Sequence, residues 1–135
     1  MFEYFSTNVK APNVHYLGFA DDDKLVELYE ENDIFVLPTF FEGMPTVVLE
    51  AMSYGMPIIV TDTGATTDLV DHTNGYIIEK ADVSSLKNAI VQFYQLDDAK
   101  KKMLSLHSYN KVKDNFTWNV VAQKHYDLFK SMSVQ

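Results

Sequence analysis

Two short apolar runs constrain the fold of this chain most. Residues 33–38 (DIFVLP) and 57–62 (PIIVTD) are apolar without the alternation of a half-exposed strand. Strands of this kind are covered on both faces, which is typical of a parallel sheet between layers of helices. Between them lies a segment with helical spacing, residues 45–54, which has Pro45 at its start and Gly55 just after its end. This order predicts an α/β fold with a parallel sheet.

The rest of the chain repeats the alternation of strands and helices. We expect further strands at residues 13–18 and 75–78, and helices at residues 22–31, 83–94, 97–113 and 117–131. Such an order predicts a Rossmann-like parallel sheet of about four strands flanked by helices. The length of 135 residues and the 47% apolar content suit one core, so we expect a single domain over residues 1–135.

Composition excludes several classes of function. The formal net charge of −8 opposes the basic surface that nucleic-acid binding needs, so we expect no nucleic-acid partner. The absence of cysteine excludes disulfides and thiolate chemistry, and the four histidines lack the spacing of metal ligands. Nothing approaches the run of roughly 18 apolar residues that spans a bilayer. We therefore expect a cytoplasmic protein.

One loop and the helix after it carry two carboxylates, Glu42 and Glu50. Gly43 between them allows a ligand to approach the backbone closely, and the amides at the start of the 45–54 helix form an anion site. Ligands of parallel α/β sheets sit beyond the carboxyl ends of the strands. This rule directs attention to the loop that contains Glu42, and also to residues 18–19 and 63–66.

Each carboxylate also has a plain structural interpretation. Glu50 has apolar neighbours, and a buried carboxylate needs donors such as the two hydroxyls of a ribose. It could equally occupy an exposed edge of its helix or cap nearby backbone. Glu42 could equally be a solvated acid near a helix start. Similarly, we interpret residues 21–23 (DDD) as a helix cap with acidic first-turn residues rather than as a metal site.

The segment from Leu37 to Gly64 resembles the GT-B glycosyltransferases of family 4, whose hallmark is Glu, seven residues, Glu. The resemblance continues through residues 68–70, 74–76 and 116–118, and covers roughly residues 13–130. Where the family has paired glycines and a following Glu, this chain has GATTD at residues 64–68. This departure affects the loop that faces the acceptor domain in the family.

The resemblance implies a role for each residue of the motif. Glu42 corresponds to the catalytic Glu that contacts hydroxyls of the donor sugar, and Glu50 to the Glu that binds the ribose. The backbone that holds the donor diphosphate corresponds to Gly43, Met44, Pro45 and Thr46. Gly18 and Phe19 would lie near the nucleotide base, although Gly18 is equally compatible with an ordinary turn.

The family resemblance also implies an activity. It is the retaining transfer of a hexose-type sugar from a nucleotide-diphosphate sugar to a saccharide or lipid-linked acceptor, as in polysaccharide biosynthesis. No cofactor is expected and no metal is required. The family binds its acceptor through an N-terminal domain that has no counterpart here. We therefore expect the C-terminal donor-binding part of a larger enzyme, inactive alone, and peripheral at the inner face of the membrane in the full-length protein.

Two alternatives remain open at the level of sequence. The chain could be a non-catalytic nucleotide-sugar-binding or regulatory module of the same fold, or part of an NDP-sugar epimerase. The amino-acid sequence of residues 42–50 favours a transferase. We also expect the helix that carries Trp118 to belong to the core, or to mediate self-association if a missing domain leaves it exposed.

Overall fold

The computed structural model describes residues 11–132. The chain divides into two units, one ending at Glu31 and one beginning at Asn32, and each is described by itself. The first unit contains helix α2 (Asp22–Glu31), as predicted. Its cap is the expected one, because the Asp21 carboxylate accepts a hydrogen bond from the Lys24 amide at 3.0 Å.

The strand predicted at residues 13–18 is wrong: the structure has no strand between residues 11 and 21. Val14, Tyr16 and Leu17 are about half-exposed there. A strand needs a hydrogen-bonded neighbour. In doubly wound sheets, two strands that are consecutive in sequence can lie on opposite sides of the point where the strand order reverses, so they need not be neighbours in the sheet. An apolar run without such a neighbour has no ladder to join.

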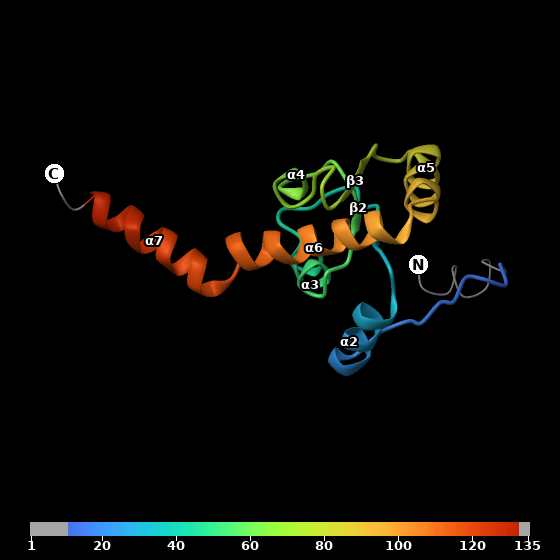
Figure 1. Cartoon of the computed structure of the whole chain (residues 1–135), viewed down its shortest axis with the longest axis horizontal. Coiled ribbons are helices and arrows are strands. Elements are labelled where there is room, and N and C mark those ends of the chain that lie inside the picture. Colours follow the sequence, from blue (N-terminus) through green and yellow to red (C-terminus); the bar gives the residue numbers. More distant parts are fainter. Residues whose placement is uncertain (1–10, 133–135) are drawn as a thin grey trace. The chain divides into compact units, whose positions relative to one another are not determined.

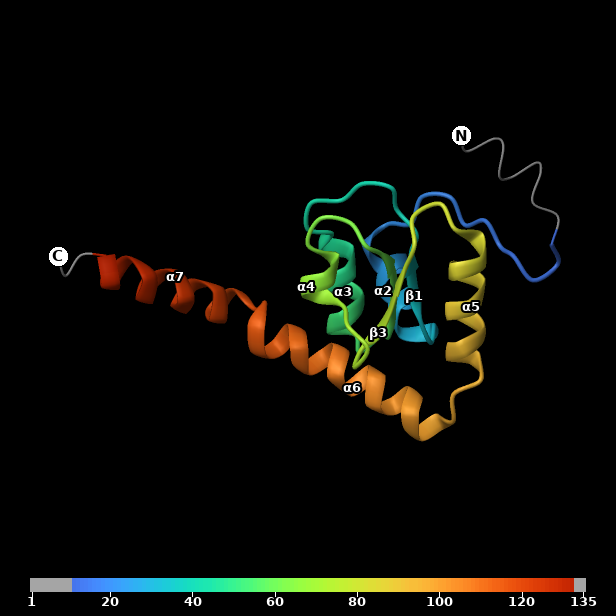
Figure 2. The ribbon, with the colours of Figure 1, turned by 90° about the horizontal axis from the view of Figure 1, so that it is seen from above.

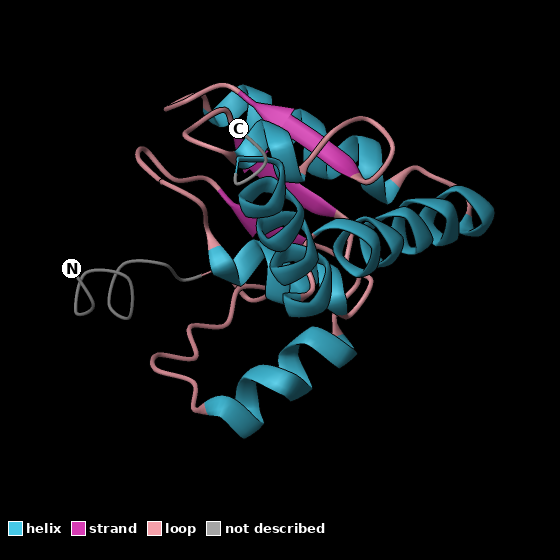
Figure 3. Ribbon diagram, turned by 90° about the vertical axis from the view of Figure 1, so that its left-hand side faces the viewer, coloured by secondary structure: helices cyan, strands magenta, loops and turns pink. Residues whose placement is uncertain are grey.

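A parallel sheet forms the centre of the second unit. Strands β1 (Phe35–Leu37), β2 (Ile58–Thr61) and β3 (Gly75–Ile78) lie in that order, and every pair is parallel (Figure 3). The described sheet thus has three strands rather than about four. The middle strand β2 is buried along its whole length, as its unbroken apolar run predicted. The α/β fold class with a parallel sheet is confirmed.

Helices flank this sheet in the second unit. Their bounds are α3 (Thr46–Ser53), α4 (Thr66–Leu69), α5 (Val83–Tyr94), α6 (Asp98–Asn115) and α7 (Trp118–Met132). Figures 1 and 2 show α3 and α5 on opposite sides of the strands. Ile59, Ile78 and Ala89 form a core cluster between the sheet and α5. On the other side, α3 contacts β1 and β2 and buries Val48 and Met52 completely.

Most helix ends follow the predicted signals. Asp82 caps α5 by accepting from the Ser84 amide at 2.8 Å, and Gly55 ends α3 with a left-handed φ of 74°. The short helix α4 had no clear signal in the sequence. Trp118 is 88% exposed, so the expectation that it belongs to the core does not hold in this structure. Among residues 11–132, no helix has both the length and the apolar character that crossing a membrane requires.

The turn before β3, residues 71–74, binds helix α6 through polar side-chain contacts. The Lys111 ammonium lies 2.8 Å from the Asp71 carboxylate, and the Ser108 hydroxyl donates to the Asn74 carbonyl at 3.4 Å. The Lys111 hydrogen bond, aided by hydrogen bonds from Thr73, holds the pKa of Asp71 well below its ordinary value. Burial opposes this effect. The ionised form of Asp71 is therefore favoured by the folded state.

We expect Asp71→Asn to destabilise the fold in a pH-dependent way. A carboxyl whose folded pKa is depressed contributes stability above its ordinary pKa of 3.8, and loses that contribution as the pH falls further. Because Asp71 is 42% exposed, the effect at neutral pH should be about 1 kcal/mol or less. Urea unfolding of the wild-type protein and of Asp71→Asn, at neutral pH and at pH values below 3.8, measures this difference in unfolding free energy. Lys111→Met, which removes the other side of the ion pair, is the matched variant. A difference that stays constant at acidic pH would contradict the assignment.

Candidate functional site

The loop between β1 and α3 carries four of the predicted donor-binding residues: Glu42, Gly43, Met44 and Pro45. Glu42 is half-buried in this loop, and Gly43 is exposed beside it. The Thr39 hydroxyl lies 3.2 Å from the Phe41 carbonyl oxygen, to which it donates. The loop begins where β1 ends, so the structure places these residues at the carboxyl edge of the sheet, where parallel α/β folds bind ligands.

The amino end of α3 differs from the starts of α2, α5 and α6. Those three helices begin at an aspartate whose carboxylate accepts a first-turn amide: Asp21, Asp82 and Asp97. Helix α3 begins instead at Pro45, whose side chain has no acceptor. Pro45 occupies the cap itself with extended ψ, rather than a position inside the first turn. The Val48 amide donates to the Pro45 carbonyl at 3.1 Å, whereas no side chain caps the amides of Thr46 and Val47, which can meet an external anion.

Glu50 occupies the exposed side of α3. Its neighbours Ala51 and Met52 face the core and are completely buried, whereas Glu50 is exposed. The structure thus agrees with the alternative that put Glu50 on an exposed edge, and the idea of a buried carboxylate in need of donors is wrong. Glu50 lies four positions after Thr46, which is about 6 Å along the helix. Glu50 therefore lies about one turn from the amino end of α3.

The end of β2 and the turn after it contact the Glu42 loop and hold it in position. The Ala65 amide donates to the Gly43 carbonyl at 2.8 Å, and the Thr61 hydroxyl donates to the Thr39 carbonyl at 2.5 Å. A Cβ on Gly64 would lie 2.1 Å from the carbonyl oxygen of Glu42. Gly64 also has a left-handed φ of 54°. Only glycine allows both this conformation and this close approach.

A buried threonine holds the supporting turn in shape. The Thr66 hydroxyl donates to the Thr61 carbonyl at 2.8 Å and accepts from the Thr63 amide at 3.0 Å. The sequence directed attention to residues 63–66 but did not reveal that this turn touches the Glu42 loop. The available signal was a glycine soon after a buried strand, which indicates a close backbone approach without naming the partner.

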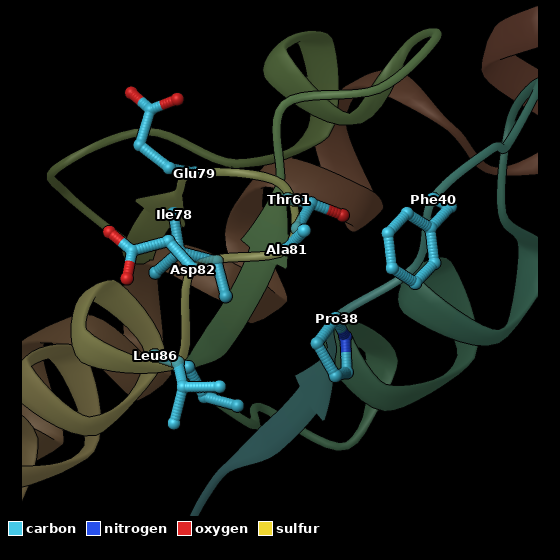
Figure 4. A pocket seen from close by; sticks show the side chains of 9 residues that line it. Pro38, Phe40, Thr61, Ile78, Glu79, Ala81, Asp82 and Leu86 are labelled. Atoms are coloured by element: carbon cyan, nitrogen blue, oxygen red, sulfur yellow. The ribbon is translucent and has the colours of Figure 1, made fainter.

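A cavity of about 270 Å³ lies next to the loop at the same edge of the sheet (Figure 4). Its lining comes from the ends of all three strands and the start of α5: Pro38, Phe40, Thr61, Ile78, Glu79, Ala81, Asp82, Val83 and Leu86. Phe40 belongs to the Glu42 loop, to which the sequence directed attention; the other lining residues were not among the sequence-based candidates. Figure 4 shows the Phe40 ring and Pro38 across an open space from Leu86 and Asp82.

The remaining site predictions concern the base and metals. Gly18 and Phe19 belong to the first unit, where Gly18 has a left-handed φ of 70° and Phe19 is 94% exposed. Their role near a nucleotide base stays a prediction. Within residues 11–132, no group of three or more His, Asp or Glu side chains is arranged to hold a metal ion.

The fold and this edge define a class of protein: a parallel α/β unit with loops gathered at the carboxyl ends of its strands. Comparison with known proteins gives the family. The model of the family described as glycosyl transferases group 1 matches residues 3–96. The chain belongs to this family, and the GT-B resemblance is confirmed.

Two relatives share 34% identity with the chain. One is UDP-Gal:alpha-D-GlcNAc-diphosphoundecaprenol alpha-1,3-galactosyltransferase of Escherichia coli, aligned over 87% of this chain and 30% of that protein. The other is N,N'-diacetylbacillosaminyl-diphospho-undecaprenol alpha-1,3-N-acetylgalactosaminyltransferase of Campylobacter jejuni, aligned over 86% and 30%. The chain thus spans about 30% of the length of these relatives.

A solved structure shows the same fold. Sucrose-phosphate synthase from Thermosynechococcus elongatus superposes with a TM-score of 0.76 at 25% identity, covering 88% of this chain and 30% of that chain.

We expect Gly64→Ala to displace the Glu42 loop. The new Cβ would collide with backbone oxygens of both Glu42 and Gly43, which cannot swing aside as a side chain can. Amide NMR shifts of residues 39–46 should change far more than those of α5. Gly55→Ala is the matched control, because its φ is also left-handed but its Cβ would meet only the Ser105 side chain, at 3.0 Å, and main-chain oxygen at 3.6 Å. Equal changes in the amide shifts of residues 39–46 in both variants would contradict the claim that Gly64 positions the Glu42 loop.

Proposed function

We propose that this chain forms the donor-binding part of a retaining glycosyltransferase that uses a nucleotide-diphosphate sugar. The observation that carries the proposal is the amino end of α3, which lacks a carboxylate cap and lies between Glu42 and Glu50 at the carboxyl edge of the sheet. A diphosphate needs donors of hydrogen bonds, and backbone amides supply them without a basic side chain. The acidic net charge of the chain makes this neutral source of donors important.

In this proposal each part of the donor meets a different part of the loop and helix. The diphosphate lies on the backbone of residues 43–46, the ribose hydroxyls donate to Glu50, and hydroxyls of the sugar donate to Glu42. Hydrogen bonds from hydroxyls to an ionised carboxylate are short and strong. Glu50 is exposed and about one helical turn from the diphosphate position, so it can meet a ribose without desolvation of an isolated charge.

Catalysis rests on stabilising the leaving group. The bond between the anomeric carbon and the diphosphate oxygen breaks, and the acceptor hydroxyl oxygen bonds to the same carbon with retention. The acceptor proton passes to the departing diphosphate. Amides aimed at the diphosphate stabilise the charge that develops there, which is the electrostatic contribution expected of preorganised donors.

The names of the relatives support an acceptor class. Both relatives at 34% identity are named for acceptors attached to diphosphoundecaprenol, and the E. coli name specifies UDP-galactose as donor. We therefore propose a saccharide or lipid-linked acceptor for the protein that contains this chain, at the inner face of the membrane. The chain spans about 30% of those relatives, so acceptor binding would involve residues beyond it.

We expect Glu42→Ala to separate binding of the sugar from binding of the nucleotide. In the full reading frame that contains this chain, the variant should bind a UDP-sugar more weakly by about 1.5–3 kcal/mol, the range for hydrogen bonds to charged groups. Its affinity for free UDP should stay nearly unchanged, because UDP has no sugar hydroxyls for Glu42. Isothermal calorimetry with both ligands measures this.

Glu50→Ala is the matched control. It should weaken UDP and the UDP-sugar equally, by a similar amount, because both carry the ribose. Equal losses for both ligands in Glu42→Ala would overturn the sugar contact. Intact binding without turnover in the wild-type protein would instead favour a non-catalytic module.

A further inference from the structure

We propose that Thr63 is a positioning residue for Glu42, and that its buried hydroxyl donates to the Glu42 main-chain carbonyl only when the donor is bound. This inference rests on the proposed function, because it takes Glu42 as the residue that meets the donor sugar. It goes beyond that function, since Thr63 lies outside the motif that contains Glu42 and Glu50.

The Thr63 hydroxyl is buried without a hydrogen-bond partner. Thr63 is 4% exposed, and among residues 11–132 its hydroxyl oxygen is the one buried side-chain polar atom that has no partner. A hydroxyl that is removed from water loses its hydrogen bonds there, so an unpaired one destabilises the fold. Such groups are rare in native proteins, and each needs a physical explanation.

The geometry of the turn does not prevent a threonine hydroxyl from finding a partner. The Thr61 hydroxyl donates to the Thr39 carbonyl, and the Thr66 hydroxyl donates to the Thr61 carbonyl. Thr61 and Thr66 are as buried as Thr63. The main chain of Thr63 is also paired, because its amide donates to the Thr66 hydroxyl and its carbonyl accepts from the Thr66 amide. Only the Thr63 hydroxyl is left without an acceptor.

An acceptor of matching chemistry lies on the neighbouring loop. The Glu42 carbonyl oxygen lies against Gly64, the residue that follows Thr63, where an added Cβ would be 2.1 Å from it. In the described part of the chain, the carbonyls of Phe41 and Gly43 each accept a hydrogen bond, whereas no hydrogen bond reaches the Glu42 carbonyl between them. An unpaired donor and an unpaired acceptor therefore belong to two stretches of backbone that touch.

Binding of the donor gives these two groups a reason to pair. The loop carries largely exposed side chains at Phe40 and Phe41, so few packing contacts oppose a small movement. A sugar held by the Glu42 carboxylate acts on the same residue whose carbonyl lies against Gly64. A shift of the loop, together with rotation of the Thr63 side chain, then forms the hydrogen bond and fixes the main chain of Glu42. The hydrogen bond favours the bound state over the free state, so it contributes to affinity.

Thr63→Val tests this role, because it removes the hydroxyl and keeps the shape of the side chain. In the full-length protein without ligand, its urea midpoint should be unchanged or higher, since no hydrogen bond is lost. Its affinity for UDP-galactose, the donor in the name of the E. coli relative, should fall about fivefold, as expected for one hydrogen bond. Its affinity for UDP should fall less than about twofold, because UDP has no sugar for Glu42. Urea unfolding and calorimetry measure these quantities.

Two further variants complete the test. Thr66→Val is the matched control, because it removes from the same turn a buried hydroxyl that makes two hydrogen bonds. Its urea midpoint should fall below that of the wild-type protein. Thr63→Ser keeps a hydroxyl at the position, so its affinity for UDP-galactose should stay within about twofold of the wild-type value.

Each outcome has a defined meaning. A urea midpoint that falls as far in Thr63→Val as in Thr66→Val would show that the Thr63 hydroxyl is already paired in the free protein, and would overturn the inference. Unchanged affinity for UDP-galactose in Thr63→Val, or equal losses for UDP and UDP-galactose, would overturn it and leave the proposed donor site intact. Wild-type protein that binds neither ligand would contradict the proposed function, and the role of Thr63 would fail with it.

Discussion

The contact between Gly64 and the backbone of Glu42 and Gly43 determines how the edge of this sheet is built. Two loops that follow neighbouring strands touch at the level of their main chains, and the Ala65 amide joins them by a hydrogen bond of 2.8 Å to the Gly43 carbonyl. Because parallel strands end at the same edge, each loop limits where the other can go. The buried Thr61 and Thr66 hydroxyls make the supporting loop rigid. These contacts fix the position of the Glu42 loop relative to the ends of the strands.

That position matters because the loop leads directly into α3. Because α3 starts at a proline, no side chain caps its Thr46 and Val47 amides, whereas an aspartate accepts a first-turn amide in each of α2, α5 and α6. In a protein with a net charge of −8, oriented amides are a source of positive potential that adds no cation. The supporting turn and the start of α3 together explain how an acidic chain could receive an anionic donor.

Local signals predicted much of this fold. The acidic cap before α2, the end of α3 at Gly55 and the unalternating run of β2 all depend on neighbours in sequence, and each was predicted correctly. The errors involve partners that are distant in sequence. The strand at residues 13–18 needed a ladder partner, and the exposure of Glu50 depended on which side of α3 meets the sheet.

At the site, too, features that depend on sequence neighbours were predicted, and features that depend on distant residues were not. The family motif identified Glu42 and Glu50, but motif spacing contains no information about Gly64, which acts through a contact with residues about twenty positions away. The cavity beside Phe40 combines three strand ends and a helix start, so no contiguous pattern could reveal it. Prediction from sequence was thus reliable for most elements and for the family, and incomplete for the surfaces that only the fold assembles.

A crystal structure of the full chain with a UDP-sugar tests the central claim most directly. The account predicts that diphosphate oxygens lie about 3 Å from the backbone amide nitrogens of Gly43, Met44 and Thr46, with ribose hydroxyls at Glu50. The Ala65 to Gly43 hydrogen bond should persist in the complex. A nucleotide bound elsewhere, with the start of α3 left to solvent, would contradict the account.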